Sequence, residues 1–176
     1  VGSNLHDHFN TFCAWRISRS ISLNELHHSV PRQLVAGLQY VFDRRGPMSG
    51  NGLYVGAMVR SDKRLERPDI QLNISAWSTI DRTRKGIVSH PFPGFAISPV
   101  HLRPEGRGTV RLRSPDPFAP PEIRFNFLRS EYDMQAMIAG MRIARQIARQ
   151  HALQKLLVAE TLPGSSIISD EQLADD

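Results

Sequence analysis

The chain has 176 residues, 40% of them hydrophobic, which is typical of a single globular domain. Its formal net charge is +5, but the arginines are scattered and form no stripe with aromatic residues, so we expect no nucleic-acid partner. No apolar run approaches the roughly 20 residues of a membrane helix, and we expect no membrane span. The one cysteine, Cys13, excludes an internal disulfide and is consistent with a reducing, cytoplasmic location.

The first third of the chain predicts one strand and then two helices. Residues 9–17 alternate with period two and should form a strand. The capping-box sequence Ser22-Leu23-Asn24-Glu25 predicts one helix start, and Pro31 opens a second helix at a position where proline costs nothing. The second helix repeats apolar residues at spacings of three and four, which predicts a face buried in the core: Leu34, Val35, Leu38, Val41 and Phe42.

The middle of the chain predicts two strands and an exposed loop. Residues 53–59 follow a glycine-rich loop and read as a small-residue strand. The next strand, 68–75, should place Ile70 and Leu72 in the core and leave its other face polar, with Gln71, Asn73 and Ser75. That polar face either meets solvent or lines a pocket. Residues 80–93 are polar and rich in turn residues, which predicts an exposed, mobile loop.

The last part of the chain predicts more strands and one long helix. A strand begins at Phe95 and includes His101, which we interpret as a structural hydrogen-bonding residue. Residues 109–113 and 122–127 alternate as half-buried strands between proline and glycine turns. A helix from Ser130 to about Leu157 should bury a stripe of small and sulfur-containing side chains: Met134, Met137, Ile138, Met141, Ala144 and Ala148. Together these elements predict an α+β fold, a mostly antiparallel sheet of five to six strands with helices packed on one face.

Three stretches resemble one known family. Residues 104–128 follow the pattern P-x-S-R-G-x-V-R-L-R-S-x-D-P-x-x-x-P-x-I-x-x-N-Y-L, with Gly106 in place of the serine and Phe127 in place of the tyrosine. Residues 1–8 resemble V-G-x-N-L-x-D-H, and residues 68–73 resemble P-D-I-Q-x-H. These patterns, in this order, resemble the C-terminal domain of the glucose–methanol–choline (GMC) oxidoreductases, flavoenzymes that oxidise alcohols.

The resemblance implies where a substrate would lie. In choline-oxidising members of this family, the histidine of P-D-I-Q-x-H hydrogen-bonds the alcohol. This chain has Asn73 there, which keeps a donor and an acceptor but does not titrate near neutral pH, so choline itself is not favoured as the substrate. We expect Asn73 and Ser75 to line the substrate pocket with Trp77 behind them. The junction motif implies that Asn4, Asp7 and His8 lie toward the cofactor.

The resemblance also implies what this chain lacks. The dinucleotide fingerprint G-x-G-x-x-G is absent, and the family's catalytic histidine would follow downstream of Asp176. We therefore interpret residues 1–176, which start without methionine, as the substrate-binding domain of a longer chain. Residues 1–8 would be the junction from an upstream FAD-binding domain, and residues 169–176 the start of a truncated helix.

The expected function is that of the longer flavoenzyme, which would use FAD to oxidise a small primary alcohol. Alone, this chain should be inactive and bind no FAD, because general-base catalysis and hydride transfer need groups that it lacks. A non-catalytic binding module that kept the fold is the alternative. His6 and His8 suggest no metal site, since no further ligands cluster with them. We also expect self-association through the face that would otherwise meet the flavin domain.

Overall fold

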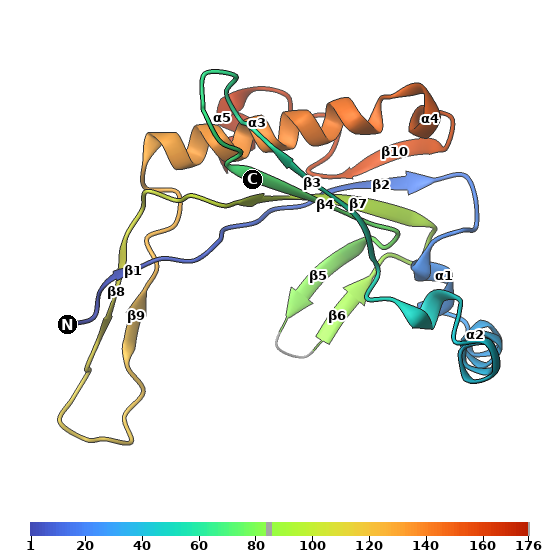
Figure 1. The fold of residues 1–176 in the computed structure, drawn as a ribbon, viewed down its shortest axis with the longest axis horizontal. Coiled ribbons are helices and arrows are strands. Elements are labelled where there is room, and N and C mark those ends of the chain that lie inside the picture. The colour runs from blue at the N-terminus through green and yellow to red at the C-terminus, as the bar shows by residue number, and fades with distance from the viewer. Residues whose placement is uncertain (84–85, 176) are drawn as a thin grey trace.

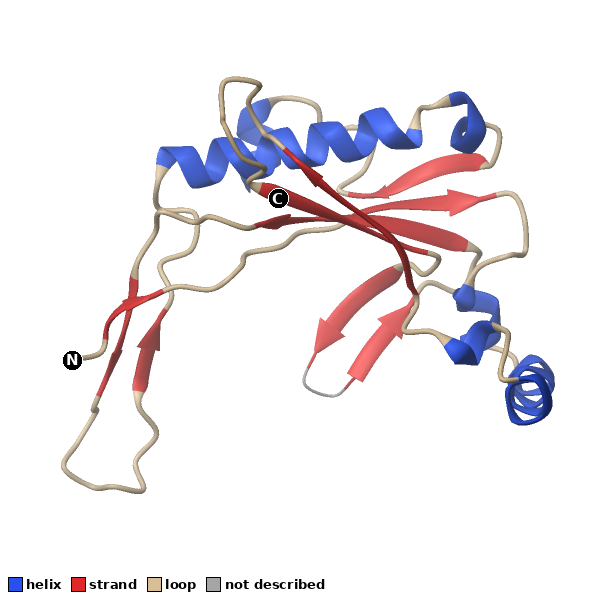
Figure 2. Cartoon of the chain, viewed as in Figure 1, coloured by secondary structure: helices blue, strands red, loops and turns tan. Residues whose placement is uncertain are grey.

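The computed structural model describes residues 1–83 and 86–175. Its centre is a five-stranded antiparallel sheet, and neighbouring strands are hydrogen-bonded in the order β10-β2-β7-β4-β3 (Figures 1 and 2). The strands are β10 (Leu157–Leu162), β2 (Cys13–Ile17), β7 (Gly94–His101), β4 (Ile70–Ser75) and β3 (Leu53–Val59). Strand β7 lies in the middle of this order and is buried along nearly its whole length, because both of its edges are paired and helix α3 covers it.

Helix α3 (Glu131–Ala148) covers one face of the sheet and forms the core with it. The core-facing side chains of the sheet alternate along each strand, as period two requires. They are Cys13, Trp15, Ile17, Ile70, Leu72 and Ile97. The helix approaches the sheet closely at Gly140, where an added Cβ would lie 2.9 Å from Cβ of Pro99. The short helices α4 (His151–Gln154) and α5 (Asp170–Asp175) lie on the same side of the sheet.

Three smaller units project from the opposite side of the sheet (Figure 1). A three-stranded arm pairs β1 (Ser3–Leu5), β8 (Gly108–Arg111) and β9 (Glu122–Arg124). A hairpin pairs β5 (Thr79–Thr83) with β6 (Gly86–Ser89). A helical unit contains α1 (Leu23–His27), α2 (Val30–Asp43) and the single 3-10 turn η1 (Pro47–Ser49). No helix among the described residues covers the face of the sheet opposite α3 (Figure 1).

The predicted fold class is confirmed, and so are several local predictions. The alternation of strand β4 places Ile70 and Leu72 in the core, as expected. The capping box at Ser22 and Glu25 is formed at the start of α1. The predicted stripe of α3 is buried in every member except Met134, which is partly buried.

Other predictions were wrong, for reasons of tertiary pairing. The long helix ends at Ala148 instead of Leu157, because residues 157–162 instead form strand β10 against β2. Residues 80–93 contain hairpin strands in place of a loop, although residues 84–85 lie outside those that the structure describes. The apolar face of α2 is exposed, with Leu34 at 65% and Phe42 at 79% of full exposure, because the described residues supply no layer to cover it. Leu112 in the arm, expected to be half-buried, is 88% exposed for the same reason.

No helix in the described part of the chain is long and apolar enough to cross a bilayer.

Candidate functional site

The candidate site is the face of the five-stranded sheet that α3 leaves uncovered, which we call the open face. Strand β4 contributes Gln71, Asn73 and Ser75 to it, since these alternate with the core residues Ile70 and Leu72. All three are half-buried. The sheet register sets Asn73 opposite two small residues, Ser98 on β7 and Gly56 on β3.

Hydrogen bonds fix the polar groups of the open face. Gln71 Nε2 donates to Asn73 Oδ1 at 2.7 Å, and Ser75 Oγ donates to the Trp77 carbonyl at 2.9 Å. Ser98 Oγ donates to the Thr11 carbonyl at 2.8 Å. The residues nearest to Asn73 in the sheet are therefore uncharged, and their hydrogen-bonding groups are held in set directions. Such a surface can orient a small neutral group by hydrogen bonds.

Ser75 and Trp77, two of the three predicted substrate residues, line different cavities among the described residues. Asn73 lies on the open face. Ser75 lines a cavity of about 210 Å³ together with Tyr54, Ile74 and Phe95. Trp77 lines a separate cavity of about 240 Å³, in which the remaining lining residues are Leu23, Leu26, His27, Gln33 and Pro47. Ser75 and Trp77 are nevertheless joined directly by the hydrogen bond from Ser75 Oγ to the Trp77 carbonyl.

Trp77 carries a feature that the sequence did not predict. Its Nε1 is buried, and no group in the described part of the chain accepts its hydrogen bond. A buried indole N–H usually has an acceptor, because leaving it unpaired costs about 1–3 kcal/mol. Its ring lies 6.0 Å from that of His27, whose Nδ1 is 2.9 Å from Ser89 Oγ. Trp77 Nε1–H is thus a buried donor that has no acceptor among the described residues.

The three residues predicted to lie toward the cofactor are exposed near the N-terminus. Asn4 is in strand β1 of the arm, with a positive φ of 67°, and its carbonyl is 3.0 Å from His6 Nδ1. Asp7 Oδ1 accepts a hydrogen bond of 2.8 Å from the amide of His8.

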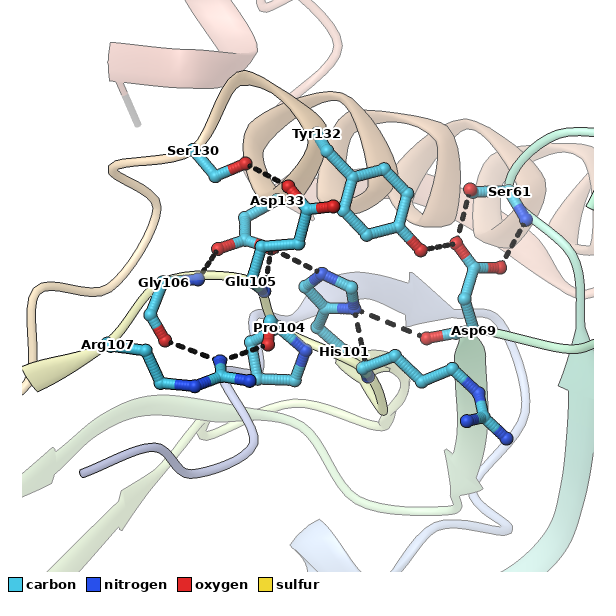
Figure 3. A network of polar contacts seen from close by, with 11 residues as sticks. Ser61, Asp69, His101, Pro104, Glu105, Gly106, Arg107, Ser130, Tyr132 and Asp133 are labelled. Carbon is cyan, nitrogen blue, oxygen red and sulfur yellow. Dashed lines mark hydrogen bonds and ion pairs between the residues drawn. The ribbon is translucent and has the colours of Figure 1, made fainter. Parts of the chain in front are cut away.

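A buried polar network joins the arm to the rest of the domain (Figure 3). The Asp133 carboxylate accepts hydrogen bonds from the amides of Glu105 (2.8 Å) and Gly106 (2.9 Å), and Oδ1 is also 3.0 Å from His101 Nε2. Burial alone would raise the pKa of Asp133, but these hydrogen bonds outweigh it, so its pKa lies below the ordinary value of 3.8. The turn that leads into β8 is thereby fixed to the first turn of α3.

Asp69 forms the second half of this network. Its carboxylate accepts from the amide of Ser61 (2.7 Å), from Ser61 Oγ (2.5 Å) and from the Tyr132 hydroxyl (3.0 Å). Burial, followed by the hydrogen bond to Asp69, raises the pKa of Tyr132 to about 12. His101 is fully buried between the two halves, which confirms its predicted structural role. The sequence around Ser130 predicts a capping-box variant with Asp133, but the Asp133 carboxylate instead accepts from the amides of Glu105 and Gly106, which are far away in sequence.

Within the residues that the structure describes, no three His, Cys, Asp or Glu side chains are grouped closely enough to hold a metal ion.

Comparison with known proteins shows which family this domain resembles. Residues 104–176 match the family model described as GMC oxidoreductase. The oxygen-dependent choline dehydrogenases of Staphylococcus aureus strains JH9 and Newman are each 29% identical to this chain over 175 residues. These matches cover 99% of this chain and 30% of each dehydrogenase, so the chain spans less than a third of the length of these relatives.

Solved structures show the same fold. A formate oxidase of Aspergillus oryzae RIB40 matches with a TM-score of 0.79 at 21% identity, covering 99% of this chain and 35% of that one. A pyridoxine 4-oxidase from Mesorbium loti matches with a TM-score of 0.73 at 16% identity, covering 99% of this chain and 30% of that one. The predicted resemblance to the GMC oxidoreductases is confirmed by these matches together, and the fold is that of their C-terminal domain.

Proposed function

We propose that this chain is the substrate-binding part of an FAD-dependent oxidoreductase that oxidises a primary alcohol to an aldehyde. The observation that carries the proposal is the open face, an uncovered sheet surface whose uncharged polar side chains are held by hydrogen bonds. The relatives also support the proposal, since choline dehydrogenases align with nearly the whole chain. FAD, when bound by the longer protein, would accept a hydride from the alcohol carbon, while the hydroxyl proton passes to a base.

The residues of this chain would bind and orient the alcohol. Asn73 and Ser75 present amide and hydroxyl groups on β4, and Trp77 presents a buried N–H that lacks an acceptor among the described residues. Asn4, Asp7 and His8 would contact the cofactor or the domain that holds it, since they are exposed beside the arm. The catalytic base is expected in the part of the longer chain that follows Asp176.

The partner of the open face would be an FAD-binding domain of the same polypeptide. Two features support this proposal. The relatives are about three times longer than this chain. No helix among the described residues covers the face of the sheet opposite α3, so a second domain would have room to lie against it.

The test is product formation by the longer protein. We expect it to convert at least one uncharged primary alcohol to its aldehyde, and we expect the 176-residue chain alone to form none. Asn73→Ala in the longer protein should lower kcat/KM for that alcohol, and unchanged kcat and KM across a panel of alcohols would remove Asn73 from the site. A longer protein that binds alcohols without oxidising any would favour a non-catalytic binding module instead.

A further inference from the structure

The side-chain amide of Asn73 has a defined orientation in this structure. An asparagine amide presents an acceptor oxygen at one end and an NH₂ donor at the other, and its neighbours decide which end points where. Here Gln71 Nε2 donates to Asn73 Oδ1 at 2.7 Å, so the oxygen is directed toward Gln71. The same oxygen lies near β3, since a Cβ added at Gly56 would be 3.9 Å from it.

The NH₂ end of Asn73 is left for a partner outside the described residues. No group in the described part of the chain accepts a hydrogen bond from Asn73 Nδ2. Ser98, which lies opposite in the sheet register, directs its own hydroxyl proton to the Thr11 carbonyl and receives Asn10 Nδ2 at 3.4 Å. Ser75 likewise commits its proton to the Trp77 carbonyl. Asn73 Nδ2 therefore keeps both of its N–H donors for a partner outside the described residues, whereas Gln71 Nε2 commits one of its two N–H groups to Asn73 Oδ1.

We propose that Gln71 is a positioning residue that holds Asn73 as a hydrogen-bond donor, so that the site selects a substrate oxygen that accepts. This inference rests on the proposed function, because it assigns a direction to the amide that would touch the alcohol. The oxygen of an alcohol gains negative charge as its proton leaves, and a fixed N–H donor stabilises that charge. A cationic group placed against the same N–H would be repelled, which favours an uncharged alcohol at this position.

The sequence context of Gln71 makes it testable without disturbing the fold. Its register partners are Met58 on β3 and Val100 on β7, so leucine at position 71 would meet apolar neighbours of similar size. Gln71→Leu removes the donor to Asn73 Oδ1 and leaves the Asn73 amide free to rotate. Gln71→Glu replaces the donor by a carboxylate, which would attract Nδ2 and turn Oδ1 toward the substrate.

The kinetic test is a double-mutant cycle in the longer flavoprotein. Gln71→Leu should lower kcat/KM about three- to tenfold, the loss of one oriented hydrogen bond. Gln71→Glu should lower it further. In an Asn73→Ala background, Gln71→Leu should change kcat/KM less than twofold, because a positioning residue has no effect once its target is gone. Gln146→Leu is the matched control, since Gln146 is exposed on α3 on the other side of the sheet and kcat/KM should stay within twofold.

A second measurement does not depend on activity. In the ¹⁵N-labelled 176-residue chain, the Asn73 NH₂ protons should exchange with water rapidly in the natural sequence and more slowly in Gln71→Glu, where they gain a carboxylate acceptor. Additive kinetic effects of Gln71→Leu and Asn73→Ala, or unchanged Asn73 exchange in Gln71→Glu, would overturn the inference while leaving the proposed function intact. A natural-sequence flavoprotein that oxidises no alcohol would overturn the proposed function, and this inference with it.

Discussion

The buried Asp133 carboxylate should contribute several kcal/mol to the free energy of unfolding. Its side chain is 2% exposed and accepts hydrogen bonds from two backbone amides and from His101. Asp133→Ala would leave the buried His101 Nε2 and the partly buried amides of Glu105 and Gly106 without this acceptor. An unpaired buried donor costs about 1–3 kcal/mol, so for three donors with non-additivity we expect a loss of about 3–5 kcal/mol.

The assay is urea unfolding of the 176-residue chain and of matched variants, followed by circular dichroism. Glu131→Gln is the control, because Glu131 is an exposed carboxylate in the same first turn of α3 and its loss should cost less than about 0.5 kcal/mol. Asp133→Asn keeps one acceptor oxygen, so its loss in free energy of unfolding should lie between those of Glu131→Gln and Asp133→Ala. An Asp133→Ala variant that unfolds within about 1 kcal/mol of the natural chain would refute the claim that this network holds the arm in place.

The pH dependence of the same transition has a defined sign. The pKa of Asp133 is lowered in the folded state, so the stability that its charge contributes is fully present above the unfolded value of 3.8. That contribution is lost as the pH falls from 3.8 through the folded pKa. The difference in free energy of unfolding between the natural chain and Asp133→Asn should therefore become smaller as the pH falls through this range. If this free-energy difference does not change as the pH falls below 3.8, the lowered pKa of Asp133 in the folded state is contradicted.

Three further predictions concern single side chains. Tyr132→Phe removes one of the three hydrogen bonds to Asp69 and should cost about 1 kcal/mol in urea unfolding, and no change would show that the two Ser61 bonds suffice. Gly140→Ala places a Cβ 2.9 Å from Pro99 and should cost about 1–3 kcal/mol, whereas an unchanged transition would mean that α3 shifts without penalty. Phe42→Ser should leave the free energy of unfolding within about 0.5 kcal/mol, since Phe42 is 79% exposed, and should reduce self-association in light scattering. A natural chain that stays monomeric at high concentration would contradict the predicted self-association.

The sequence predicted those elements whose hydrophobic period matches their surroundings. The alternation of Ile70 and Leu72 is met by α3 on one face, and the stripe that includes Met137 and Met141 meets the sheet in return. The same kind of apolar pattern gave a wrong prediction of burial where no described residues cover the helix. The apolar positions of α2 have the spacing of a core face, yet Leu34 is 65% exposed because nothing in the described chain packs on it.

Long-range pairing explains the other failures. Residues 149–157 contain neither proline nor glycine to end a helix, yet they form the short helix α4 and then enter β10, whose first residue, Leu157, pairs with Ile17 of β2. The Asp133 carboxylate meets the amide of Glu105, which is 28 residues away in sequence. Local sequence patterns carry no information on such contacts, whereas the position of Asn73 on the polar face of β4 follows from alternation alone.

One visible absorption spectrum tests whether the open face serves a flavin and an alcohol. The longer protein that contains this chain is purified, and its visible absorption is recorded without oxygen before and after primary alcohols are added. We expect flavin absorption bands that bleach when at least one uncharged primary alcohol is added. A protein that shows no flavin bands even after FAD is added, or bands that no alcohol bleaches, would contradict it.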